Sequence, residues 1–268
     1  MTLGADLVAL SVDETRGEIR FATQLGCVLA AAELVDLANL RRIEAVGTGI
    51  RVVEQLRTGD SVLDQTLGQL AAGIKGFKEQ SIGSWIALAA PDRVAVHLAA
   101  MIESGELAGR LVRPSLDSPA RPVGLRVADP GRRKLLAEKV VAVALYASPL
   151  EDDAFGALAF AAEQTAHIGS VRSRIRVQKR LKELTSWFAD TWRYLPGVPD
   201  ELALGDDDVE PGDVNPADDE PWRLLIRLAV YEGTKRAAER TRTSERDNGL
   251  SKDVRNAALL AYAWDHGL

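Results

Sequence analysis

Residues 21–60 set the outline of the fold, because they combine a long apolar helical pattern with two short strand patterns. Apolar residues recur at spacings of three and four over Leu25–Ala38, which predicts a helix that is buried along most of its length. Gly47-Thr48-Gly49 then separates strand-like stretches at 42–46 and 50–54, as the turn of a β-hairpin does. A helix followed by a hairpin is the outline of a winged-helix-like unit.

The rest of the chain repeats this combination of helices and small hairpins. A short strand, a turn and a second short strand are predicted within 7–20, and Pro91 is typical of the first turn of a new helix. A second hairpin is predicted from 107–113 and 122–127, so that helix and hairpin follow each other twice. The remaining predicted helices span 61–72, 81–89, 91–103, 131–148, 154–168, 171–194, 222–241 and 251–264. We therefore predict a mainly α protein, a multi-helix core with small β-hairpins.

Charge and composition divide the chain into three predicted parts. A helical domain spans 1–195, an acidic flexible linker spans 196–220 and a C-terminal helical segment spans 221–268. Residues 200–220 carry ten acidic side chains and no lysine or arginine, with few large apolar groups, which is typical of disorder. The net charge is −6 for the whole chain but +4 without this segment, so the body is mildly basic.

The sequence contains no recognisable catalytic motif. We find no nucleophile elbow, no P-loop and no complete dinucleotide fingerprint. The three histidines, His97, His167 and His266, lack the spacing of metal ligands, and Cys27 has no partner for an internal disulfide. The N-terminus has no basic region before its short apolar run, so no secretory signal is predicted. We expect a cytoplasmic, non-enzymatic protein without a metal or a cofactor.

A basic run at 172–182 is the strongest charge feature of the predicted helix over 171–194. It contains six cationic residues and no acidic one, namely Arg172, Arg174, Arg176, Lys179, Arg180 and Lys182. A solvated helix face, a contact with an anionic membrane and a contact with nucleic acid each explain the pattern. No aromatic residue is interleaved with the basic ones, which disfavours nucleic acid. Arg172, Arg176 and Arg180 are our candidates for a membrane-facing surface.

Several motifs occur in the order found in one known family, and together they cover about residues 5–170. They are Leu7-x-x-Leu10-x-x-Asp13 with Gly17, Asp36-Leu37-Ala38-Asn39-Leu40-Arg41-Arg42-Ile43, Thr58-Gly59-Asp60-x-x-Leu63-Asp64-x-x-Leu67, Trp85-Ile86-x-Leu88 and Ile102-Glu103-Ser104-Gly105-Glu106-Leu107. In this order and spacing the chain resembles the Golgi phosphoprotein 3 family. The resemblance implies a mainly helical fold and a β-hairpin that helps oligomerisation and membrane contact.

The resemblance also implies binding of phosphatidylinositol 4-phosphate and of the tails of membrane proteins. The family's headgroup tryptophan falls at Phe21, and we assign Phe21, Arg20 and Arg93 to a candidate headgroup site. Family arginines fall at three positions that are not cationic in this chain, namely Ala30, Pro91 and Val94. A helix that begins at Pro91 would offer free backbone N–H groups to an anion beside Arg93.

Three functions follow from this reading of the sequence. The first is a non-enzymatic peripheral membrane adaptor that binds anionic lipid headgroups of the phosphatidylinositol phosphate type, on the inner face of the membrane. The second is a protein-binding scaffold without a lipid site. The third is a winged-helix nucleic-acid binder, which is disfavoured because the helix over 22–40 carries Glu33 and Asp36 and no interior lysine or arginine.

Overall fold

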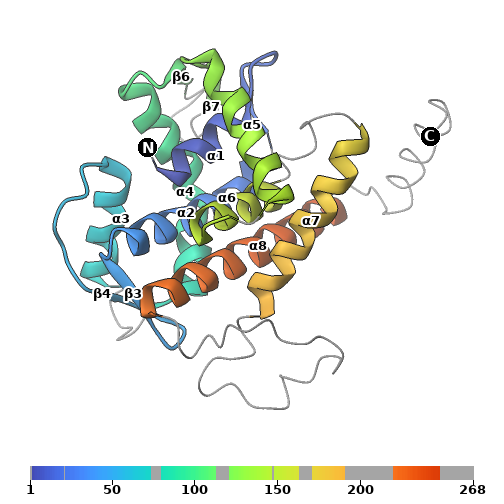
Figure 1. Ribbon diagram of the computed structural model, residues 1–268. Coiled ribbons are helices and arrows are strands. Elements are labelled where there is room, and N and C mark those ends of the chain that lie inside the picture. Colours follow the sequence, from blue (N-terminus) through green and yellow to red (C-terminus); the bar gives the residue numbers. More distant parts are fainter. Residues whose placement is uncertain are drawn as a thin grey trace.

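The computed structural model confirms a mainly helical chain with small antiparallel hairpins (Figure 1). It describes residues 2–20, 22–73, 80–112, 121–146, 148–162, 171–190 and 220–247. The helices are α1 (Leu3–Ser11), α2 (Ala22–Asn39), α3 (Ser61–Ala72), α4 (Ile82–Glu103), α5 (Pro130–Leu145), α6 (Leu150–Ala161), α7 (Val171–Asp190) and α8 (Pro221–Asp247).

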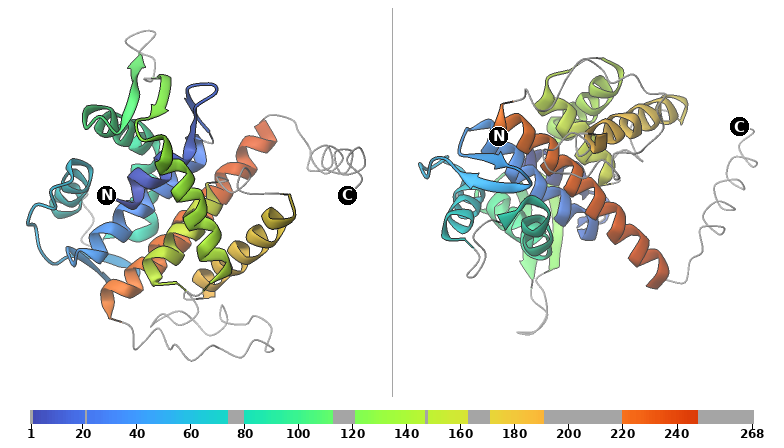
Figure 2. Two further views of the ribbon diagram at one scale, coloured as in Figure 1. Left: turned by 45° about the horizontal axis from the view of Figure 1, so that its top comes forward. Right: turned by 90° about the horizontal axis from the view of Figure 1, so that it is seen from below.

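Short strands form three small sheets. They are β1 (Val12–Asp13), β2 (Glu18–Ile19), β3 (Ile43–Val46), β4 (Gly49–Val52), β5 (Gln80–Ser81), β6 (Leu107–Val112) and β7 (Arg121–Val127). β1 pairs with β2, β4 lies between β3 and β5, and β6 pairs with β7, all antiparallel. The β6–β7 hairpin projects from the helical body (Figure 2). Both predicted hairpins are therefore confirmed.

Helix α2 lies at the centre of the fold and is buried on nearly every side. It packs most extensively against α8 and next against α4, with α1, α3 and α6 also in contact. Two glycines allow this close packing, because a Cβ on Gly26 would lie 2.3 Å from the Ala90 carbonyl oxygen and one on Gly233 would lie 2.5 Å from the Ala31 Cβ. The sequence pattern predicted the apolar face of this helix, but the burial of Glu33 on the side expected to be polar was not predicted.

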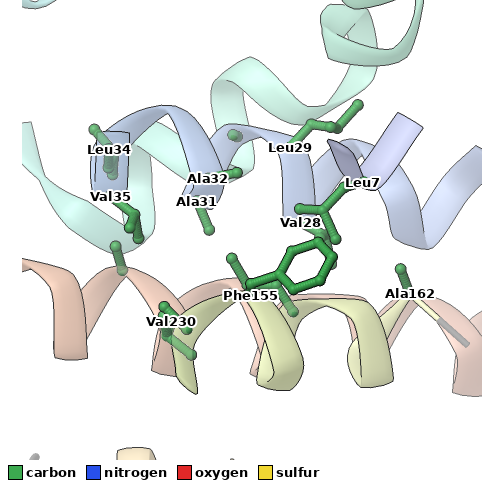
Figure 3. Packing of buried hydrophobic residues seen from close by; sticks show 14 of the residues in the cluster. Leu7, Val28, Leu29, Ala31, Ala32, Leu34, Val35, Phe155, Ala162 and Val230 are labelled. Carbon is green, nitrogen blue, oxygen red and sulfur yellow. The ribbon is translucent and has the colours of Figure 1, made fainter. Parts of the chain in front are cut away.

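One hydrophobic cluster joins the N-terminal helices to α6 and α8. Figure 3 shows Phe155 of α6 projecting toward Leu7 of α1 and Val28 of α2, with Val230 of α8 nearby. Because α8 contributes buried residues to this cluster, it is part of the same core as α2. The predicted boundary at 195 and the predicted helix over 251–264 fall on residues outside those the structure describes, and they stay predictions, as does the boundary at 220, of which the structure describes only the C-terminal side.

The first predicted strand was wrong, because residues 7–11 belong to helix α1. The Thr2 hydroxyl accepts a hydrogen bond from the Ala5 N–H, and the Asp36 carboxylate accepts one from the Leu3 N–H at 2.9 Å. These acceptors satisfy N–H groups at the helix start. The helix then buries Leu7, Val8 and Leu10 in the core, a tertiary gain that a short local pattern did not reveal.

Helix α4 also differs from expectation, since one continuous helix replaces the two predicted around Pro91. Pro91 lies in its interior, so its predicted role at a helix start was wrong. Among the described helices, α4 alone is long and apolar enough to cross a bilayer by length and composition. It contacts α1, α2, α3 and α8 and buries Trp85 and Ile86, as a core helix does.

Candidate functional site

A pocket of about 770 Å³ lies beside α4, and we call it the α4–hairpin pocket. Its walls come from β2, the first turn of α2, the middle of α4, the β6–β7 hairpin and one residue of α8. Pro91, Val94, Ala95 and Leu98 line it from α4, at the spacing that places side chains on one helix face. A volume of this size is typical of small-molecule sites.

The walls of the α4–hairpin pocket are mainly apolar. The hairpin adds Leu111, Pro122 and Val123, and Val123 leaves 47% of its surface exposed. Pro91 and Val94, near which the family resemblance implies arginines, line this pocket as apolar residues. No cationic residue of α4 is among the described residues that line the pocket.

Arg240 of α8 is the only cationic residue among the described residues that line the pocket. Its position is fixed by the packing of α8 on α2, where the Gln24 side-chain amide donates a hydrogen bond to the Thr241 hydroxyl at 3.1 Å. The guanidinium also reaches the Cys27 thiol. Burial raises the pKa of this thiol, while Arg240 and Arg236 act in the opposite direction.

Arg93 lies on the opposite side of α4 from the pocket, in a buried polar cluster. Only 4% of its surface is exposed, and its Nη1 atom lies 3.6 Å from the Glu33 carboxylate of α2. Arg93 also donates hydrogen bonds to Thr66 and to Gln69, the latter at 2.7 Å. The second Glu33 oxygen is joined to His97 Nε2 at 2.9 Å. The Arg93 guanidinium also lies over the Trp85 ring, with its carbon 5.4 Å from the ring centroid.

Of the predicted headgroup residues, the structure describes Arg20 and Arg93, and these two form separate ion pairs. Arg20 forms an ion pair with Asp13 at 2.9 Å, and Phe21 lies outside the described residues. Arg93 does not line the α4–hairpin pocket. For Arg93 to bind an anion, its buried ion pair with Glu33 would have to break. The free N–H groups expected at Pro91 are also missing, because α4 continues through it. A headgroup role for these residues stays a prediction.

Helix α7 presents a basic face to solvent, and we call the exposed residues Ile175, Arg176, Lys179 and Arg180 the α7 basic face. Their spacing places them on one side of the helix. Ile175 has 65% of its surface exposed, and Arg180 forms an ion pair with Glu183 at 3.1 Å. Two of our three candidate membrane residues, Arg176 and Arg180, thus lie side by side. Arg172 lies on the same helix, but its side chain is outside the described set.

Sequence reasoning missed Arg240 and the partners of Arg93. Arg240 lies in a highly charged stretch near the end of α8, and no local pattern distinguishes it from its neighbours. A buried glutamate on an apolar helix was the available signal for Arg93, because a buried charge requires a partner. That signal predicts a cation near Glu33 but does not identify which one.

The family resemblance was tested against protein-family models. Residues 3–198 match the model described as Golgi phosphoprotein 3 (GPP34). No curated protein matches the chain. The match covers most of the chain, includes α1 to α7 and ends before α8, which supplies Arg240. The chain belongs to the Golgi phosphoprotein 3 (GPP34) family.

Proposed function

We propose that this protein is a non-enzymatic adaptor that associates peripherally with anionic membranes. The observation that carries the proposal is the α7 basic face, where exposed cations surround an exposed isoleucine. Helices that lie on membrane surfaces combine these two features, since cations attract anionic headgroups and apolar side chains enter the interface. Family membership supports the same function.

The attraction of this face to a membrane is electrostatic and adds up over its cations. Each lysine or arginine close to an anionic surface contributes about 1 kcal/mol, and salt screens the interaction. Lys182, also exposed, extends the basic character of α7. In this proposal the lipid surface is recognised by its charge density, and the protein lies on the cytoplasmic side. Membrane-protein tails and a second copy at the β6–β7 hairpin are further partners that the family suggests.

A protein-binding scaffold without a specific lipid site is the second candidate function. It is favoured by the apolar residues Pro91 and Val94, which occupy positions where the family resemblance implies arginines. This candidate predicts no difference between anionic and neutral membranes.

Vesicle flotation separates the two candidates. The wild-type protein should float with vesicles of phosphatidylcholine and phosphatidylglycerol at low salt and remain behind with phosphatidylcholine alone. The triple variant Arg176→Gln, Lys179→Gln and Arg180→Gln should bind roughly a hundredfold more weakly, from about 1 kcal/mol per charge.

A matched control removes the same number of charges elsewhere. Arg51→Gln, Lys134→Gln and Lys235→Gln neutralise exposed cations on β4, α5 and α8. This control variant should bind anionic vesicles nearly as well as the wild type. If both triple variants lost the same affinity for anionic vesicles, net charge alone would explain the binding. That result would contradict a specific role for the α7 basic face. Failure of the folded wild type to float would support the scaffold.

A further inference from the structure

We propose that the α4–hairpin pocket binds a single alkyl chain that ends in one anionic group, such as a long-chain carboxylate. This is a different ligand class from a phosphorylated headgroup. It rests on the lining of the pocket and does not depend on membrane binding by α7.

The first argument is the chemistry of the pocket wall. Val94, Ala95 and Leu98 of α4 face Leu111 and Val123 of the hairpin across a volume of about 770 Å³. Ala95 and Val123 are exposed, so apolar side chains line a pocket that is open to water. An alkyl chain placed there would remove apolar surface from water on both sides, which gives about 25 cal/mol for each Å² buried.

The second argument is the charge around the pocket. Glu18 and Asp92, both exposed, contribute carboxylates to the lining, and Arg240 contributes the one cation among its described residues. These carboxylates repel any anion, and they repel a doubly charged headgroup more strongly than a group with a single charge. One anionic group beside Arg240 can form a charge-assisted hydrogen bond with its guanidinium. The lining therefore fits one charge and a long apolar chain.

The third argument is the shape of the site. The volume lies within the range of small-molecule sites, which combine apolar walls with a few polar groups. The α4 wall of the pocket extends over about two turns, from Ala90 to Leu98, a length that a small amphiphile can span.

Arg240 also explains why the C-terminal helix belongs to the site. Helix α8 lies outside the family match, yet its packing on α2 and the hydrogen bond from Gln24 to Thr241 hold Arg240 at the pocket. Two features thus differ together from the resemblance, since the α4 positions are apolar and the cation comes from α8. Together they change the ligand that the pocket can accept.

Calorimetric titration of the full chain with dodecanoate, below its micelle concentration and without vesicles, tests the proposal. Dodecanoate should bind saturably, whereas butanoate and soluble inositol bisphosphate should not. Dodecanol should bind more weakly than dodecanoate, because it lacks the charge that pairs with Arg240. The Arg240→Gln variant should lose about tenfold or more in affinity for dodecanoate and little for dodecanol.

Two variants change the apolar wall at positions that tolerate substitution. Val94 is half-buried and Ala95 is exposed, so Val94→Asp and Ala95→Trp should fold normally, as a thermal unfolding curve checks. Each should abolish dodecanoate binding, the first because a carboxylate in the wall repels the carboxylate of the ligand and the second because the indole fills the pocket. Unchanged binding in both folded variants would overturn the proposal. So would saturable binding of inositol bisphosphate in place of dodecanoate.

The α7 triple variant makes this test independent of the membrane proposal. It should bind dodecanoate as the wild type does, since the α7 basic face does not line the pocket. A protein that binds dodecanoate but ignores anionic vesicles would contradict only the membrane proposal. The reverse result, vesicle binding without dodecanoate binding, would contradict only the alkyl-chain proposal.

Discussion

A surface helix normally buries its apolar side and exposes its charged side, and around Arg93 helix α4 does the reverse. Its inner side carries Arg93 and His97 into a buried cluster with Glu33. Its outer side presents Pro91 and Val94 to the α4–hairpin pocket. The comparison teaches that Arg93 and His97 of this helix contribute to its internal packing, while Pro91 and Val94 line a pocket.

The inner side of α4 must supply partners for a carboxylate, because Glu33 is fully buried. Its two oxygens interact with Thr66, His97 and Arg93, which together supply the partners that a buried carboxylate needs. A buried ion pair does not by itself add stability, but removing one partner leaves an uncompensated charge. The predictions below therefore begin with this cluster.

The largest expected effect is that of Arg93→Met, which should destabilise the fold by about 3–5 kcal/mol, since it removes the cation beside a buried carboxylate. Urea denaturation measures the change. The double variant Glu33→Gln with Arg93→Met should recover part of the loss. Arg176→Met on the α7 basic face should change stability by no more than about 0.5 kcal/mol. Equal stability of Arg93→Met and wild type would remove the structural role assigned to Arg93.

The close approach of α2 to α4 gives the next largest effect. Gly26→Ala places a Cβ 2.3 Å from the Ala90 carbonyl oxygen, one residue before Pro91, so the helices must separate. We expect a loss of about 1–3 kcal/mol, as for other overpacked cores. Gly68→Ala on α3 is the matched control, because its Cβ would meet nothing within 4 Å and alanine favours a helix by up to about 1 kcal/mol. Thermal unfolding should move the two variants in opposite directions, and parallel shifts would contradict the packing.

The last effect depends on pH and concerns Asp36, a second carboxylate on α2, which accepts a backbone hydrogen bond from Leu3. Burial raises its pKa from 3.8 to about 7, although the Leu3 and Gly4 N–H groups act in the opposite direction. The folded protein therefore holds a proton that the unfolded chain releases, so this residue makes stability fall as pH rises from about 4 to 7. Asp36→Asn should flatten that slope in urea denaturation. An identical slope in both proteins would show that Asp36 titrates normally.

The sequence contained enough information to predict most helices and strands. It contained little information on which side of each helix is buried and which is exposed. The Gly47-Thr48-Gly49 turn could be predicted because it depends on local geometry. The Asp60 cap of α3, whose carboxylate accepts hydrogen bonds from the Val62 and Leu63 N–H groups, is equally local. Proline is compatible with the start of a helix and also with the interior of a helix that neighbouring elements stabilise. Pro91 alone therefore could not decide between two helices and one continuous helix.

Long-range contacts explain what the sequence could not predict. Arg93 was expected at an open site because family motifs place cations nearby, but its partner Glu33 is on another helix, far away in sequence. Arg240 reaches the pocket through packing between residues 217 positions apart, such as Gln24 and Thr241. Periodicity predicts that a helix has a buried face, and it does not identify the partner helix.

The division between the two sides of α4 is tested most directly by a crystal structure of the protein grown with dodecanoate. The alkyl chain should lie along Pro91, Val94 and Leu98 with its carboxylate beside Arg240, and the ion pair of Arg93 with Glu33 should remain intact. An anionic group bound to Arg93, with Glu33 displaced and the α4–hairpin pocket empty, would contradict this account of the molecule.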